Sequence, residues 1–218
     1  MGVMRIKGIK GAIFDMDGTL IDSMGIWEEI DVEFLKKRGI EMPKDLAREI
    51  GHMSFEEVAV YFKRRFNLKE EVNEIMAEWD EMAYYHYANT IGLKPGAMDY
   101  LQKLKDGGVK IGLATASSRR HTDAVLKNNN IYHYFEIIST VDEIKKDKSS
   151  PYIYIRTCEQ LGISPHECAV FEDIYMAVLS AKKAGMKVIG VYDEYAEHQM
   201  EDIKRKADMY IKDFYELM

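Results

Sequence analysis

The sequence predicts an α/β protein: a parallel sheet with helices on both faces, interrupted by an all-helical insert. Three observations support this. Short apolar runs rich in β-branched residues alternate with helical patterns, the strand pattern is missing between Asp22 and about Ile91, and candidate catalytic residues stand where several runs end. With 218 residues, 47% of them hydrophobic, the chain is long enough to bury a substantial core.

Six apolar runs are the predicted strands. They span residues 11–14, 109–115, 135–140, 168–173, 187–193 and 207–213. Because helical segments separate most of them, the strands are expected to pair in parallel. Ligands of such sheets bind beyond the carboxyl ends of the strands. Attention therefore falls on Asp15, Thr115 and the pair Glu172 and Asp173, which stand where their runs stop.

The segment between the first two strands is predicted to be a separate helical domain. The stretch Lys94-Pro95-Gly96 indicates a turn at which the chain returns from this segment to the sheet. We therefore expect a core domain of residues 1–21 and 92–218 and a cap domain of residues 22–91. Within the cap, apolar residues recur at helical spacing in three groups: Trp27, Ile30 and Phe34; Phe55, Val58 and Phe62; Val72, Ile75, Trp79 and Met82.

Composition and charge exclude several classes of protein. A formal net charge of -7 argues against a general nucleic-acid binder. Arg5, Lys7 and Lys10 interrupt the N-terminal segment, so neither a signal peptide nor a membrane span is expected there. Cys158 and Cys168 lack zinc-like spacing and are interpreted as reduced core thiols. We expect a cytoplasmic monomer that binds neither nucleic acid nor membranes.

The segment FDMDGTL, residues 14–20, places Asp15 and Asp17 two positions apart after an apolar run. Two neighbouring carboxylates repel each other unless a cation, a protonated member or a reaction compensates. Asp15, at the strand end, is suited to act as a nucleophile or metal ligand, and Asp17 is suited to exchange a proton. Gly18 permits a tight turn. This motif alone does not exclude a solvated turn followed by a helix cap.

Three further segments extend the predicted site. Residues 113–119 end a strand in small hydroxyl residues, which suit either a phosphate cradle or a helix N-cap. Residues 145–151 carry three lysines, and Glu172 and Asp173 form a second acidic pair. Mg²⁺ binds through one or two carboxylates together with substrate phosphate and water. The four segments together predict one site for an anion and Mg²⁺.

In this order, the segments resemble the four motifs of the haloacid dehalogenase (HAD) superfamily. The matching stretches are DMDGTLIDS, LATASSR, Lys148 with Pro151, and FEDIYMAVLSAKKAGM. An insert directly after the first motif is similar to that of the β-phosphoglucomutase-like branch. The resemblance covers nearly the whole chain and implies a Rossmann-like HAD core with a helical cap.

The resemblance implies a role for each matching residue. Asp15 would be the nucleophile that forms an aspartyl phosphate, and Asp17 the general acid and base. Thr115, the adjacent Ala116 and Lys148 would bind the phosphoryl group. Serine follows Lys148 where the family commonly has proline, so the lysines at 145 and 146 stay open as alternative occupants of its role.

The same resemblance implies Mg²⁺ as the cofactor. Asp15, Asp173 and Asp17, the last through its backbone carbonyl, would hold the ion. Glu172 would lie close to the metal or to its bound waters.

The implied function is that of a Mg²⁺-dependent phosphatase acting on a small organic phosphate monoester, such as a sugar phosphate. Asp17 argues against dehalogenase chemistry, because family members with that activity generally lack it. A sugar-phosphate mutase of the β-phosphoglucomutase type is the alternative, weakened by Trp27 where those enzymes have a histidine. A non-catalytic phosphate-binding regulator is a second alternative. His52 and Trp27 are the candidate specificity residues in the cap.

Overall fold

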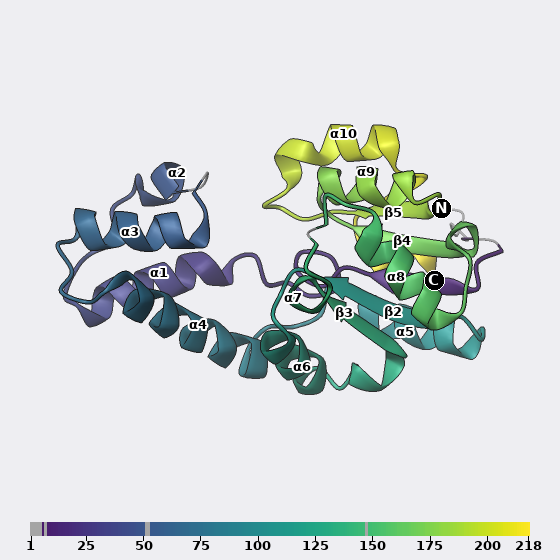
Figure 1. The fold of residues 1–218 in the computed structure, drawn as a ribbon, viewed down its shortest axis with the longest axis horizontal. Helices are drawn as coiled ribbons and strands as arrows, with labels where there is room; N and C mark the ends of the chain where they lie inside the picture. The colour runs from purple at the N-terminus through teal and green to yellow at the C-terminus, as the bar shows by residue number, and fades with distance from the viewer. Residues whose placement is uncertain (1–5, 7, 51–52, 147) are drawn as a thin grey trace. The chain divides into compact units, whose positions relative to one another are not determined.

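One six-stranded parallel sheet organises the larger of two units of the chain (Figure 1). The computed structural model describes residues 6, 8–50, 53–146 and 148–218. Its strands are β1 (Gly11–Phe14), β2 (Lys110–Thr115), β3 (Ile137–Thr140), β4 (Cys168–Glu172), β5 (Lys187–Val191) and β6 (Met209–Ile211). They lie in the order β3-β2-β1-β4-β5-β6, and all neighbouring pairs are parallel. The central position of β1 places its carboxyl end between those of β2 and β4.

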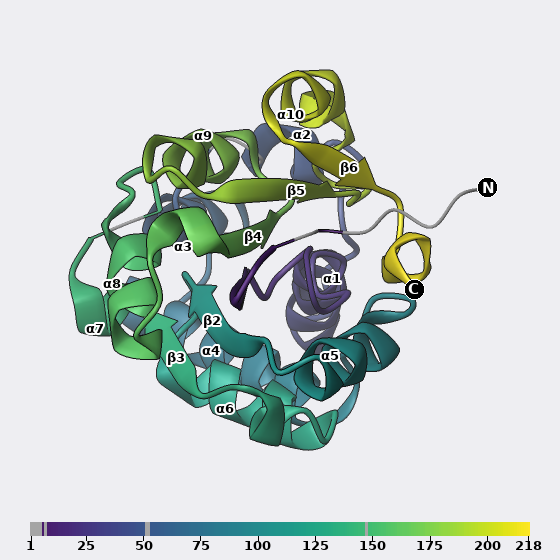
Figure 2. The ribbon, with the colours of Figure 1, turned by 90° about the vertical axis from the view of Figure 1, so that its right-hand side faces the viewer.

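Helices cover both faces of this sheet, which confirms the predicted α/β class. They are α5 (Ala97–Asp106), α6 (Arg119–Asn128), α7 (Val141–Ile144), α8 (Tyr152–Leu161), α9 (Tyr175–Lys183) and α10 (Met200–Lys206). Short 3₁₀ turns are η1 (Tyr132–Tyr134), η2 (Pro165–Glu167), η3 (Glu197–Gln199) and η4 (Phe214–Leu217). Figure 2 shows α8 and α9 on one side of the sheet and α5 on the other. In the described ranges, every helix is too short or too polar to cross a membrane.

Alternation along the central strands builds a separate core on each face. Ile13 and Val170 belong to a buried cluster that includes residues of α8, α9 and α10. Phe14 and Phe171 stack on the opposite face with ring centroids 4.4 Å apart. Tyr100 of α5 packs against both of these rings. Side chains packed on both faces of the sheet therefore hold the ends of the central strands in place.

The backbone leaves and re-enters the sheet unit at adjacent points. Ile21 and Leu93 form an antiparallel bridge. Asp22 N donates to Gly92 O at 3.0 Å, and Lys94 N donates to Leu20 O at 2.9 Å. The two linkers are thus paired with each other by main-chain hydrogen bonds.

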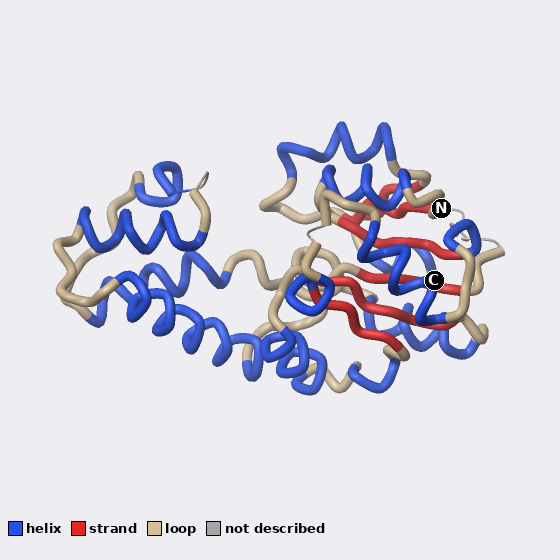
Figure 3. The backbone as a smooth tube through the Cα atoms, in the orientation of Figure 1, coloured by secondary structure: helices blue, strands red, loops and turns tan. Residues whose placement is uncertain are grey.

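The smaller unit, Gly25–Thr90, contains helices and no strand in the residues that are described (Figure 3). Its helices are α1 (Ile26–Lys37), α2 (Leu46–Ile50), α3 (Phe55–Arg65) and α4 (Val72–Asn89). The predicted apolar stripes meet in its core, where Trp79 packs edge-on against Phe34 and Phe62 at centroid distances of 5.3 and 4.9 Å. Ser54 caps α3 through a capping box with Glu57.

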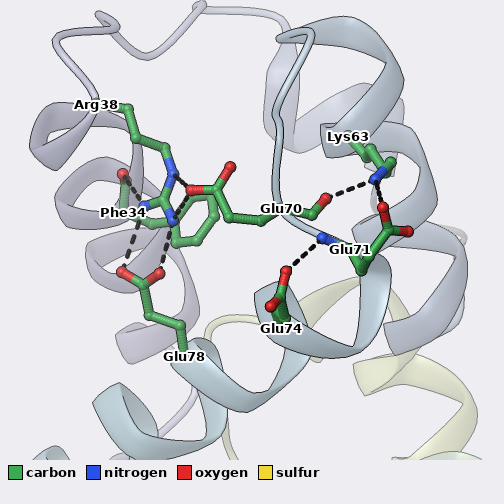
Figure 4. Close-up of polar contacts among 7 residues, drawn as sticks. All are labelled: Phe34, Arg38, Lys63, Glu70, Glu71, Glu74 and Glu78. Atoms are coloured by element: carbon green, nitrogen blue, oxygen red, sulfur yellow. Dashed lines mark hydrogen bonds and ion pairs between the residues drawn. The ribbon is translucent and has the colours of Figure 1, made fainter.

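A half-buried arginine ties the helices of the smaller unit together (Figure 4). The Arg38 guanidinium donates to Glu70 Oε1 at 2.7 and 2.9 Å and to Glu78 Oε2 at 2.6 Å. It also lies 3.6 Å from the centroid of the Phe34 ring. Because the Arg38 side chain is only 17% exposed, these charge-assisted hydrogen bonds form in a partly desolvated setting. They join the end of α1 to α4 and to the segment that precedes it.

Candidate active site

The carboxyl ends of the central strands bring most of the predicted site residues to one pocket. This pocket has a volume of about 260 Å³. Six predicted residues line it: Asp15, Asp17, Ala116, Lys148, Glu172 and Asp173. Asp15 follows β1, Glu172 ends β4, and Ala116 follows β2. Their convergence follows from the strand order, since β1 lies between β2 and β4.

Asp15 is buried and paired with a cation. Its backbone N–H donates to Phe171 O at 3.0 Å, which continues the β1–β4 ladder by one residue. The Lys148 ammonium forms ion pairs with the Asp15 carboxylate and with Glu172 Oε1, the latter at 2.6 Å. Lys146 is exposed, and its ammonium lies 4.6 Å from the centroid of the Tyr152 ring. Of the lysines weighed from the sequence, Lys148 thus lies beside the acidic residues.

Three carboxylates form a cluster with the donor set that Mg²⁺ prefers. Asp15, Glu172 and Asp173 are all buried, and each offers an oxygen within 4.8 Å of the others. Thr19 Oγ1 donates to Asp173 Oδ1 at 2.7 Å. Within the described part of the chain, Glu172 Oε2 is buried without a hydrogen-bond partner. Hard oxygen ligands and an unpaired buried carboxylate oxygen fit a divalent cation.

Burial dominates the electrostatics of this cluster. It raises the pKa of Glu172 to about 7, and it also raises the pKa of Asp15 and that of Asp173. Burial alone would lower the pKa of Lys148, but the carboxylates of Asp15 and Glu172 outweigh this and raise it. One ammonium therefore faces three acidic groups, so the site favours additional positive charge.

Asp17 lies in the same pocket but has a different set of partners. Ser23 Oγ donates to its Oδ1 at 2.8 Å, and Ser117 Oγ donates to its Oδ2 at 2.6 Å. Gly18, directly after Asp17, has φ +74°, and a Cβ at that position would collide with Asp173 Oδ2. Hydroxyl groups therefore orient the carboxylate of Asp17, whereas Lys148 pairs with that of Asp15, which suits two different chemical tasks.

The hydroxyl residues after β2 act at least as a structural cap. Ser118 Oγ accepts a hydrogen bond from His121 N at 3.3 Å at the start of α6. Thr115 is fully buried, and its Oγ1 accepts from Ser117 N at 3.0 Å. The helix-cap interpretation is confirmed, while phosphate binding by Thr115 and Ala116 stays a prediction.

The two candidate specificity residues belong to the segment between β1 and β2. Trp27 belongs to α1 of the helical unit, where its ring packs against Phe55 at a centroid distance of 5.7 Å. His52 lies outside the described residues. Their role in substrate recognition stays a prediction.

Four supporting residues were not singled out from the sequence, namely Thr19, Ser23, Ser117 and Tyr154. Each donates a hydroxyl hydrogen bond to one of the carboxylates in the pocket. Thr19, Ser23 and Ser117 belong to the motif segments, so their position in the sequence could have indicated a role in the site. Tyr154 lies within a helix, where an aromatic residue indicates only a place in the core.

Comparison with known proteins identifies relatives of this chain. The family model described as "Haloacid dehalogenase-like hydrolase" matches residues 12–191. "Putative phosphatase YhcW" of Bacillus subtilis is 31% identical, over 83% of this chain and 82% of its own length. "Phosphorylated carbohydrates phosphatase" of Thermotoga maritima is 26% identical, over 83% of this chain and 84% of its own. The crystal structure of a "putative beta-phosphoglucomutase" from Thermotoga maritima superposes with a TM-score of 0.85 at 25% identity, covering 96% of this chain and 97% of that one.

The fold and the acidic site define an enzyme of the phosphoric monoester hydrolase class, a phosphatase. The chain belongs to the haloacid dehalogenase-like hydrolases, in their β-phosphoglucomutase-like branch.

Proposed function

We propose that this phosphatase hydrolyses a small organic phosphate monoester, such as a sugar phosphate, in a Mg²⁺-dependent reaction through an aspartyl phosphate. The convergence of the Asp15, Glu172 and Asp173 carboxylates beside Lys148 is the observation that carries the proposal. The relative named for phosphorylated carbohydrates supports a sugar phosphate as the substrate.

In the first step, a carboxylate oxygen of Asp15 attacks the phosphorus atom of the bound monoester. The phosphorus–oxygen bond to the leaving group breaks, and Asp17 donates a proton to the departing alkoxide. Lys148 neutralises negative charge on the phosphoryl oxygens, and it is already held beside Asp15 by an ion pair. Asp17 is placed for this proton transfer because the hydroxyls of Ser23 and Ser117, rather than the acidic cluster, orient its side chain.

In the second step, Asp17 removes a proton from a water molecule that attacks the phosphorus of the aspartyl phosphate. The bond between phosphorus and the Asp15 oxygen breaks, which releases inorganic phosphate and restores Asp15. One residue thus serves as acid and then as base, so each turnover returns it to its starting protonation state.

Asp15, Glu172 and Asp173 would hold Mg²⁺, together with the backbone carbonyl of Asp17. When bound, the ion supplies positive charge that stabilises the phosphoryl oxygens during transfer. The unpaired Oε2 of Glu172 supports this assignment.

We further propose that residues 22–91 form a cap domain that selects the substrate, with Trp27 and His52 as candidate contacts. A cytoplasmic location is also proposed. Cys158 and Cys168 are buried free thiols, the state that a reducing compartment maintains.

The test is phosphate release from a broad panel of phosphomonoesters, with and without Mg²⁺. Asp15→Asn serves as the blank, because an amide cannot form the aspartyl phosphate. Asp17→Asn should lower kcat by roughly 100-fold or more, because proton transfer is lost. Release that is independent of Mg²⁺, or that persists in Asp15→Asn, would contradict the proposed chemistry.

A sugar-phosphate mutase is the second candidate, and the match to a structure described as a putative β-phosphoglucomutase favours it. Incubation with a hexose 1-phosphate and a trace of hexose bisphosphate separates the two activities. A phosphatase yields mainly inorganic phosphate, whereas a mutase yields mainly the 6-phosphate.

A further inference from the structure

Tyr154 of α8 reaches the acidic cluster from the core of the sheet unit. Its side chain is fully buried and belongs to the apolar cluster that also contains Ile13 and Val170. Its hydroxyl donates to Glu172 Oε1 at 2.5 Å. The ordinary pKa of a tyrosine hydroxyl is about 10, so the hydroxyl keeps its proton at neutral pH. A rigid ring thus presents a permanent donor to one carboxylate oxygen.

The two oxygens of Glu172 have different surroundings. Oε1 contacts both the Tyr154 hydroxyl and the Lys148 ammonium, at 2.5 and 2.6 Å. Oε2 is buried and has no hydrogen-bond partner among the described residues. Because Tyr154 fixes Oε1, rotation of the carboxylate is restricted and Oε2 stays available.

Lys148 cannot provide the same anchor throughout a reaction. Its ammonium also pairs with Asp15 and is the cation proposed to contact the phosphoryl group. Thr19 plays the corresponding part for Asp173, through a hydrogen bond of 2.7 Å. Tyr154 is therefore the uncharged, substrate-independent anchor of Glu172.

We infer that Tyr154 is a positioning residue that holds Glu172 in the orientation required for Mg²⁺ binding. This rests on the proposed function, since it assigns Glu172 to the metal site. Hydrogen-bond partners of metal-binding residues typically account for about 10- to 100-fold in metal affinity. Loss of the hydroxyl alone should raise the Kd for Mg²⁺ by about 10-fold or more.

The test is calorimetric titration of the substrate-free protein with MgCl₂, comparing wild type with Tyr154→Phe. Phenylalanine keeps the buried ring and removes only the hydroxyl. Tyr134→Phe is the matched control, because Tyr134 is also buried and its hydroxyl donates to Gln102 Oε1 at 2.7 Å, among residues that do not line the acidic pocket. The expected result is weaker Mg²⁺ binding in Tyr154→Phe and wild-type binding in Tyr134→Phe. Equal melting temperatures in EDTA would show that both variants are folded.

A double-mutant cycle with Glu172→Gln separates positioning from a general structural effect. If Tyr154 acts through Glu172, adding Tyr154→Phe to Glu172→Gln should weaken Mg²⁺ binding no further. An equal loss in both backgrounds, a wild-type Kd in folded Tyr154→Phe, or no Mg²⁺ binding by wild type would each overturn the inference. A wild type that binds Mg²⁺ but hydrolyses no monoester would refute the proposed function and leave the positioning role intact.

Discussion

At the scale of single residues, the turn after β1 places three demands on Gly18. The backbone of Gly18 has φ +74°, and the Asp173 carboxylate fills the space where a Cβ would lie. The turn must also place the next residue, Thr19, so that its hydroxyl donates to Asp173. A side chain at this position would strain the backbone and collide with that carboxylate. The DxDGT motif is therefore a packing constraint as well as a set of chemical groups.

Gly18→Ala should reduce kcat/KM by roughly 100-fold, because the new Cβ displaces the Asp173 carboxylate. Gly185→Ala is the matched control. Gly185 has φ +79°, and a Cβ added there would meet no atom of the described residues within 4 Å. It therefore carries the backbone cost of about 1 kcal/mol without a collision. Steady-state kinetics and urea unfolding of both variants test this. Equal losses of activity would contradict the proposed collision.

The residues of the site were predictable only in part. Asp15, Asp17, Glu172 and Asp173 follow from motifs because they stand at strand ends. Ser23 donates to Asp17 from six positions away, but other hydrogen bonds join distant segments, such as the bond from Ser117 to Asp17 across 100 positions. Sequence spacing carries no information about such a contact until the sheet order is known.

At the scale of elements, the Arg38 network fixes the helical unit. Arg38→Ala would leave Glu70 and Glu78 close together without their shared cation. We expect the free energy of unfolding to fall by about 1–2 kcal/mol, allowing for the partial exposure of both carboxylates. Urea unfolding followed by the fluorescence of the tryptophans measures this change.

Lys37→Ala provides the control for this prediction. Lys37 ends α1, directly before Arg38, and pairs with Glu33 at 3.0 Å, but both side chains are about half exposed. Its removal should change stability by less than about 0.5 kcal/mol. A loss as large as that of Arg38→Ala would indicate that the network adds nothing beyond an ordinary surface pair.

The sequence predicts which helices and strands exist more reliably than the residues at which they begin and end. The helical stripes of residues 27–34, 55–62 and 72–82 lie within α1, α3 and α4. The third strand begins at Ile137, two residues later than the apolar run that predicts it. Phe135 is buried without belonging to the strand, because apolar residues mark burial and not hydrogen-bonded pairing.

At the scale of the whole molecule, the acidic cluster makes stability depend on pH and on metal. The pKa of Glu172 rises from 4.5 to about 7 on folding, chiefly through burial. Between these values the folded protein binds more protons than the unfolded chain, so the free energy of unfolding falls as pH rises. In metal-free protein this effect is on the order of 3 kcal/mol.

Urea unfolding in EDTA between pH 5 and 8 tests this dependence. Glu172→Gln should flatten the decline, because the amide does not titrate. The remaining decline includes the titration of Asp31 in the helical unit. Burial and the neighbouring Glu28 raise the pKa of Asp31 to about 7. Mg²⁺ should stabilise wild type most at pH 8, where the carboxylates are ionised. A steeper decline of the free energy of unfolding in Glu172→Gln than in wild type would contradict the raised pKa of Glu172.

The paired linkers also bear on how such a molecule can be diversified. The main chain departs at residues 20–22 and returns at residues 92–94, and hydrogen bonds join these two short segments directly. A foreign segment with similarly close ends can therefore replace Gly25–Thr90 without a change in strand order. Ser23 precedes this segment and donates to Asp17, so recombination of the helical unit alone keeps that contact with the site.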